Sequence, residues 1–104
     1  MKTCYLYRSD KPEKKFLVII KDSKEDKGKK VYFGATGYSD YTQHKDYERM
    51  KRYTDRHRSR ENWNKNGITT AGWWAKNILW NKQSLNSSIR DVQDQFKIKI
   101  IKKF

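Results

Sequence analysis

The stretch that decides the fold runs from Tyr38 to Lys82 and reads YSDYTQHKDYERMKRYTDRHRSRENWNKNGITTAGWWAKNILWNK. It contains all four tryptophans and both histidines of the 104-residue chain. The apolar fraction of the whole chain is only 35%, whereas aromatic residues reach 14%. Because tryptophan buries a large area, we expect this stretch to supply much of a small core rich in aromatic rings.

Residues 46–61 contain no glycine or proline and are rich in Arg, Lys and Glu. This composition predicts a helix, whose start either Asp46 or Thr42 is expected to cap. Five basic residues fall on one face of that helix, at spacings of 4, 3, 4 and 4. We call them the basic stripe: Lys45, Arg49, Arg52, Arg56 and Arg60.

Like charges on neighbouring helical positions repel one another, so a basic stripe is costly unless something neutralises it. Phosphates neutralise such a stripe, and arginine can contact a phosphate through two parallel hydrogen bonds. The stripe is therefore interpreted as a nucleic-acid-binding surface. The alternative is a solvated face whose acidic partners lie elsewhere in the fold.

A second face of the same helix is predicted to point toward the core, and it carries Met50, Tyr53 and His57. His57 and Glu61 are four residues apart, so a hydrogen bond between them is geometrically easy. One interpretation is a satisfied polar pair beneath the tryptophans. The other is a metal or acid–base site that also uses Asp46 and His44, although this spacing matches no established metal signature.

Residues 71–81 form a second predicted helix, capped by Thr69 or Thr70. Its apolar residues lie nearly all round, as expected of a buried helix, and Trp73, Asn77 and Trp80 share one face. The tryptophans could instead stack on the bases of a single strand. The core interpretation is preferred because the rest of the chain has too few large apolar residues to form a core.

Three short strands are predicted before this stretch, at residues 4–7, 16–20 and 31–33, and they are expected to form an antiparallel meander. The second strand is a continuous apolar run, which indicates that both of its faces are covered.

After the central stretch, Ser84 is expected to cap an amphipathic helix. Its apolar stripe consists of Leu85, Ile89, Val92 and Phe96. Residues 97–101 alternate between lysine and isoleucine and suggest a fourth strand. The prediction is an α+β fold with a small antiparallel sheet of three to four strands, packed against about three helices. Residues 1–104 form one domain, with a strand-rich part (1–37), central helices (38–82) and an amphipathic helix with a basic tail (83–104).

The charge balance is strongly basic, with 25 Lys and Arg against 12 Asp and Glu and a formal net charge of +13. This excess is spread over the chain, which favours a polyanion partner, nucleic acid first. A merely solubilising surface is the alternative. The single cysteine, Cys4, excludes an internal disulfide and favours a reducing compartment. No signal peptide or membrane-spanning apolar run is present, so neither secretion nor membrane insertion is expected.

Several strings within the chain occur together in a recognisable order. They are Val31-Tyr32-Phe33-Gly34, Tyr38-Ser39-Asp40-Tyr41-Thr42, His44-Lys45-Asp46, Arg56-His57-Arg58, Arg60-Glu61-Asn62-Trp63, Thr70-Ala71-Gly72-Trp73-Trp74 and Leu79-Trp80-Asn81-Lys82. This pattern resembles a family of small basic proteins encoded by giant nucleocytoplasmic large DNA viruses, a family without an established activity. The resemblance implies a viral protein, located in the virion or in the cytoplasm or nucleus of the infected cell.

Three functions follow from these observations. The leading one is binding of DNA or another polyanion through the arginine-rich helix, with packaging in the virion as an expected setting. The alternative is a minor structural virion protein that contacts other viral proteins and has no affinity for nucleic acid. A metal-dependent phosphodiesterase is less favoured, so no catalytic residue, metal ligand or cofactor is assigned.

Overall fold

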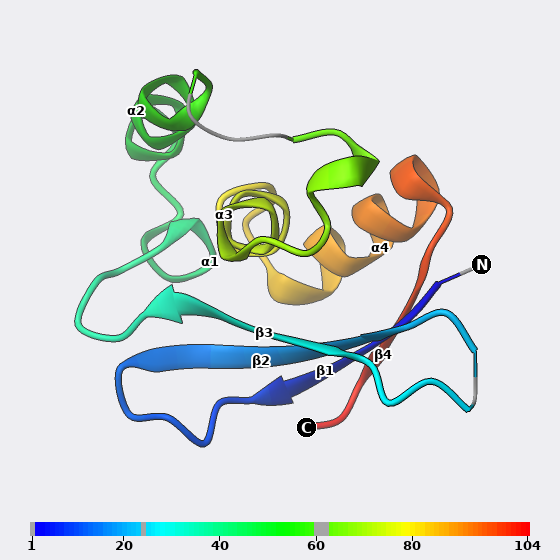
Figure 1. The fold of residues 1–104 in the computed structure, drawn as a ribbon. Helices are drawn as coiled ribbons and strands as arrows, with labels where there is room; N and C mark the ends of the chain where they lie inside the picture. The colour runs from blue at the N-terminus through cyan, green and yellow to red at the C-terminus, as the bar shows by residue number, and fades with distance from the viewer. Residues whose placement is uncertain (1, 24, 60–62) are drawn as a thin grey trace.

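The computed structural model describes residues 2–23, 25–59 and 63–104. Within these residues the chain forms one four-stranded sheet, and its helices gather on one face of that sheet (Figure 1). The strands lie in the order β3-β2-β1-β4, with bounds β1 (Thr3–Arg8), β2 (Lys14–Lys21), β3 (Lys29–Ala35) and β4 (Lys99–Lys102). The predicted α+β class is therefore confirmed.

The first three strands form the predicted antiparallel meander, with β2 paired to β1 on one side and to β3 on the other. The fourth strand differs from the prediction of an antiparallel sheet. It pairs with β1 in parallel, so that Ile100 lies beside Cys4, and the sheet is mixed. The alternation of residues 97–101 predicts a strand but carries no information on direction, which depends on the path of the chain through the preceding helix.

The helical elements begin close to the predicted caps. Their bounds are α1 (Tyr41–His44), α2 (Tyr47–His57), the 3-10 turn η1 (Lys65–Gly67), α3 (Ala71–Trp74), the π-helical turn η2 (Ala75–Leu79) and α4 (Leu85–Phe96). Asp46, Thr70 and Ser84 each accept a backbone N–H at the start of α2, α3 and α4. Ser84 is thus confirmed, and of the predicted alternatives Asp46 rather than Thr42 and Thr70 rather than Thr69 are the caps. The central helix is shorter than the predicted span of 46–61, because it ends at His57.

The core contains two of the four tryptophans. Trp73 and Trp74 are both 0% exposed and meet edge to face, with ring centroids 5.0 Å apart. Trp74 also packs on Phe33 of the sheet, whereas Trp73 packs on Phe96 of α4. The core interpretation is thus confirmed for this pair, while Trp80 is only half-buried.

Both buried indole groups find a hydrogen-bond acceptor in the segment that precedes α3. Trp73 Nε1 donates to the Asn64 carbonyl at 2.8 Å, and Trp74 Nε1 donates to the Ile68 carbonyl at 2.7 Å. A buried N–H without a partner is costly, so these bonds tie the segment to the core.

The prediction that both faces of the second strand are covered is wrong. In β2, Phe16, Val18 and Ile20 are buried, but Leu17 and Ile19 are only half-buried. They lie on the side of the sheet opposite the helices, which we call the outer face, and no described helix covers it (Figure 1). A continuous apolar run cannot distinguish a strand buried on both sides from one that leaves apolar residues on an open face.

Candidate functional site

A cleft of about 540 Å³ lies on the helical side of the molecule, between α2 and the ends of β2 and β3. The loop after β3 and the helical segment α3–η2 complete its walls. Among its lining residues are four basic ones, one acidic one and four with aromatic rings. These are Lys14, Lys15, Arg49 and Arg56, then Asp40, and then Tyr38, Tyr53, His57 and Trp80. We call this the basic cleft; among its described lining residues, four basic ones less one acidic one give a formal charge of +3.

The acidic residue of the basic cleft already has a basic partner. Lys15 Nζ lies 2.6 Å from Asp40 Oδ2, and their side chains are only 16% and 4% exposed. Lys15 also donates to the Tyr38 carbonyl and to Gln43 Oε1. Asp40 in turn caps α1. The pair therefore holds the loop between β3 and α1, and it engages the one carboxylate found among the described residues of the lining.

Aromatic stacking attaches the helix that carries the arginines to the rest of the fold. Tyr53 stacks on Trp80, with ring centroids 4.2 Å apart and planes 3° from parallel. His57 stacks on the other side of Tyr53 at 4.1 Å. We call Trp80, Tyr53 and His57 the aromatic stack. No residue of α2 is buried, and the helix lies at the periphery of the molecule (Figure 1).

The second face of this helix points toward the body of the protein, as predicted, but its residues do not reach the buried core. Tyr53 and His57 point toward the body of the protein, and Met50 is half-buried with them. Tyr53 stacks on the half-buried Trp80 rather than entering the interior of the core, and His57 stacks on Tyr53.

The π-helical turn sets the position of Trp80. The Trp80 N–H donates to the Ala75 carbonyl, five residues earlier, and the buried Asn77 side chain donates to the Trp73 carbonyl. A π-turn changes the angular phase of the residues that follow it. Trp73 and Trp80, predicted to share one face, consequently contact Phe96 and Tyr53, which belong to different helices.

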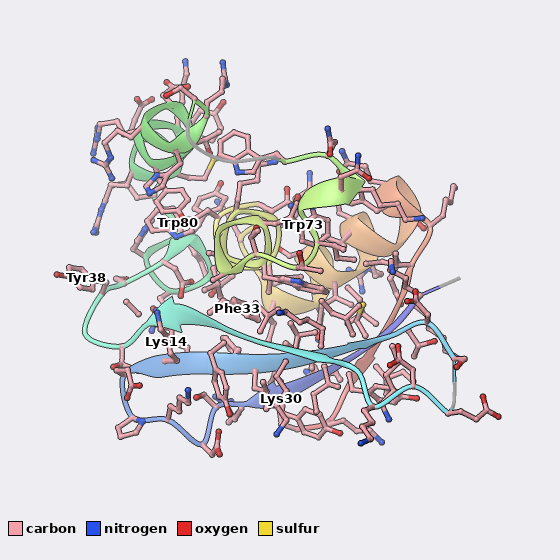
Figure 2. All side chains as sticks on the ribbon, in the orientation of Figure 1. Lys14, Lys30, Phe33, Tyr38, Trp73 and Trp80 are labelled. Atoms are coloured by element: carbon pink, nitrogen blue, oxygen red, sulfur yellow. The ribbon has the colours of Figure 1, made fainter. Side chains whose placement is uncertain are left out.

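Three members of the basic stripe lie where the sequence predicts them. Arg49, Arg52 and Arg56 are exposed along one face of α2, and two of them, Arg49 and Arg56, line the basic cleft. Figure 2 shows nitrogen-tipped side chains that project from α2 away from the sheet. The fifth predicted member, Arg60, lies outside the described residues.

The structure corrects the prediction that Lys45 lies on the same helix as the arginines of the basic stripe. Lys45 ends α1 in the left-handed conformation, with φ 56°, and so precedes α2 instead of belonging to it. Its ammonium donates to the Gln83 carbonyl at 2.9 Å and to the Thr42 carbonyl at 3.2 Å. Lys45 is separated from α2 because it ends the short helix α1, which was not predicted, while α2 starts anew at its own cap, Asp46.

The residues of the acid–base alternative do not come together in the described parts of the chain. His44 Nδ1 accepts the Asp46 backbone N–H at 2.9 Å, and His57 Nδ1 lies 2.8 Å from the Tyr53 carbonyl. Both rings are thus engaged with nearby backbone. Glu61, the predicted partner of His57, is outside residues 2–23, 25–59 and 63–104, and within those ranges no three His, Cys, Asp or Glu residues form a metal-binding group.

His44 occupies an unfavourable position for a charge. Its Nε2 is buried and has no hydrogen-bond partner among the described residues. Burial lowers the pKa of His44, and the nearby positive charge of Arg49 lowers this pKa further. A neutral imidazole with its proton on Nε2 is the form that fits the hydrogen bond from Asp46.

Sequence reasoning missed the contribution of the sheet to the cleft. Lys14 and Lys15 stand next to one another at the start of β2, and their register brings Lys14 beside Ala35. That pairing, together with the loop that follows, places both lysines near arginines more than thirty residues away along the chain. No local signal in the sequence marks this relationship.

Residues 4–57 match a family described as a family of unknown function (DUF5754). The matched segment is just over half of the 104 residues. The chain belongs to this family. The match runs from the second residue of β1 to the end of α2, and therefore includes the four basic residues named above for the cleft, but it ends before Trp80.

Comparison with the curated proteins and with the solved structures finds no match. Among the described residues, no helix combines the length and the hydropathy needed to cross a membrane.

Proposed function

We propose that this protein binds DNA or another polyanion through the arginine face of α2 and the adjoining basic cleft. The observation that supports this most directly is the convergence of Arg49 and Arg56 with Lys14 in one cleft. Asp40, the one acidic residue among the described residues that line the cleft, is engaged by Lys15. Among the described lining residues, a phosphate entering the cleft would therefore meet several cations, and the carboxylate of Asp40 is already engaged.

Arginine suits this role because its planar guanidinium can make two parallel hydrogen bonds to a phosphate. Arg52, exposed between Arg49 and Arg56 on the same face, extends the contact surface along the helix. The net charge of +13 adds long-range attraction, which raises the rate of association with a polyanion at low salt.

Binding of this kind depends steeply on salt, because each neutralised phosphate releases condensed counterions. Contacts from three arginines and Lys14 correspond to about four phosphates, so the slope of log K against log salt is expected to be about −3.6. The resemblance to proteins of giant viruses supports viral DNA as the polyanion and the virion or infected cell as the location.

The experiment compares two doubly substituted proteins with the wild type in DNA-binding titrations at two salt concentrations. Arg49→Glu/Arg52→Glu reverses two charges on the arginine face. Lys51→Glu/Arg58→Glu reverses two exposed charges on the opposite side, at Lys51 within α2 and at Arg58, the residue that caps its C-terminal end. The two variants therefore have the same net charge and differ in which face has changed. The second also removes the exposed contact between Arg58 and Asp55, which contributes less than about 1 kcal/mol.

The first variant is expected to bind DNA about 100-fold more weakly and to show a salt slope closer to zero by about 2. The second should lose much less affinity. Equal losses of DNA affinity in both variants would mean that only the net charge matters and not the arginine face, which would overturn the proposal. A wild-type protein that does not bind DNA at low salt would also overturn it.

A further inference from the structure

The outer face of the sheet is a second surface with an unusual combination of side chains. The register places two rows of residues across it, one containing Tyr7, Leu17 and Tyr32 and the other containing Tyr5, Ile19, Lys30 and Ile101. All the apolar members of these rows are half-buried. Three tyrosine rings thus remain accessible on a face that no described helix covers (Figure 1).

The spacing of the rings follows from strand geometry. Tyr5 and Tyr7 are two residues apart on β1, which separates them by about 7 Å, and Tyr32 lies two strands from Tyr7, about 10 Å away. Stacked bases are only about 3.4 Å apart along a strand. Each ring is therefore far enough from the next to stack on a different base.

Lysines surround these rings. Lys11 Nζ lies 4.2 Å from the centroid of the Tyr32 ring, while the ammonium groups of Lys21 and Lys103 lie 5.6 and 5.7 Å from that of Tyr5. Lys30 extends from the outer face, on the side of the sheet away from Phe33 (Figure 2). Lys99 completes the set beside Thr3.

None of these five lysines forms an ion pair with an acidic residue in the described part of the chain. Asp10 is close to this surface, and it accepts a hydrogen bond from the Tyr32 hydroxyl at 2.8 Å. The outer face therefore combines open aromatic rings with a positive charge that the described residues leave largely uncompensated.

We propose that the outer face binds single-stranded nucleic acid, with bases stacked on Tyr5, Tyr7 and Tyr32 and phosphates held by the surrounding lysines. Aromatic rings stack on unpaired bases of any identity, and lysines attract the backbone. A duplex cannot use the rings, because its base faces are already stacked on one another. A second copy of this chain is a poor occupant, because five lysines would face five lysines.

This proposal goes beyond polyanion binding by α2, because it concerns a different face and a different form of nucleic acid. The two are separable, since the basic cleft lies on the helical side of the sheet and the outer face on the other. Flexible lysine side chains that now rest on the tyrosine rings can move to phosphates when bases take their place.

The test measures the affinity of the full chain for a short oligothymidylate and for a duplex of the same length at low salt. Tyr5→Leu/Tyr7→Leu removes two rings but keeps apolar bulk on β1. Tyr47→Ala is the control, because Tyr47 is 57% exposed on α2, away from the arginine face. Thermal unfolding of each variant verifies that the sheet is intact.

The double leucine variant is expected to bind oligothymidylate at least about tenfold more weakly, with little change in duplex binding. Tyr47→Ala should bind both ligands as the wild type does. Unchanged oligothymidylate binding in a folded double variant would overturn the proposal, as would equal losses for both ligands. Loss of binding to anionic lipid vesicles or to an acidic peptide, with oligothymidylate binding intact, would assign the face to that other partner.

The Arg49→Glu/Arg52→Glu variant separates the two proposals. If α2 fails to bind DNA, this variant leaves duplex affinity unchanged, whereas the effect of Tyr5→Leu/Tyr7→Leu on oligothymidylate remains. If the outer face does not bind single strands, Tyr5→Leu/Tyr7→Leu leaves oligothymidylate affinity unchanged, whereas Arg49→Glu/Arg52→Glu still weakens duplex binding.

Discussion

Tyr53 and Trp80 stack face to face, with ring centroids 4.2 Å apart and planes 3° from parallel. This contact joins the arginine-bearing helix α2 to the π-helical turn that follows α3, and so to the core. Because α2 has no buried residue of its own, the position of its arginines depends on this stack. The relationship links the packing of one tryptophan to the geometry of the proposed binding surface.

Replacement of Tyr53 by alanine is expected to loosen α2 without unfolding the sheet. The loss of stacking on Trp80 and His57 should lower the free energy of local unfolding of α2 by about 1–3 kcal/mol. Hydrogen exchange of the α2 amides should become correspondingly faster. Tyr47→Ala, on the same helix but 57% exposed, should change stability by less than about 0.5 kcal/mol. The same exchange rates in both variants would mean that stacking does not hold the helix.

Substitution of Asp40 by asparagine is expected to destabilise the fold strongly. It leaves the Lys15 ammonium, whose side chain is only 16% exposed, without its negative partner, which should cost about 3–5 kcal/mol. Urea unfolding measures the change. The control is Lys2→Met, which breaks the more exposed pair with Asp22 and should cost less than about 1 kcal/mol. A comparable effect of the two substitutions would contradict the importance assigned to the buried pair.

Stability is expected to fall on mild acidification because of His44. Burial and the positive charge of Arg49 lower the pKa of His44 from its ordinary value of 6.5, so the unfolded chain takes up a proton at higher pH than the folded chain does. The contribution of His44 is complete above pH 6.5 and is lost as the pH falls through the lower pKa of the folded state. Protonation would also put a second N–H against the Asp46 amide that now donates to Nδ1.

Urea midpoints measured across this range test the prediction. His44→Phe keeps a ring beside Trp80 and should show a weaker dependence on pH. An identical dependence in wild type and variant would show that other groups account for the acid sensitivity.

Cys4 is expected to resist thiol reagents in the native protein. Its side chain is 0% exposed, and burial raises the pKa of the thiol to about 12, so that almost none is thiolate at about pH 8. Alkylation should be slow in buffer and rapid in denaturant. Ser23→Cys places a thiol at an exposed position and should react quickly in the same native protein; rapid modification of Cys4 without denaturant would contradict its burial.

Local signals predicted the elements of this fold well. The caps at Asp46, Thr70 and Ser84 were correct because a cap is made within three residues, by one side chain and the backbone N–H groups next to it. The apolar stripe of α4 and the strands of the meander follow from residue periodicity in the same way. The arginine face of α2 was predictable for the same reason, since helical spacing alone aligns its members.

The full set of residues that form the site was harder to predict from the sequence. Lys45 satisfies the helical spacing of the stripe, yet a left-handed residue at that position separates it from α2. Lys14 and Lys15 show no relationship to the arginines until the sheet register and the Asp40 pair bring them together. Likewise, only the structure shows that the tyrosine rings of the outer face are accessible, because no described helix lies on that side.

The sequence by itself determined the α+β class, the helix starts and the face on which Arg49, Arg52 and Arg56 lie, because these depend on interactions between residues close in the chain. Only the tertiary structure decided that β4 runs parallel to β1, that no described helix covers one face of the sheet and that the aromatic stack places α2 beside the basic cleft. Each of those features depends on contacts between distant residues, whose free energy is gained only after the chain has packed.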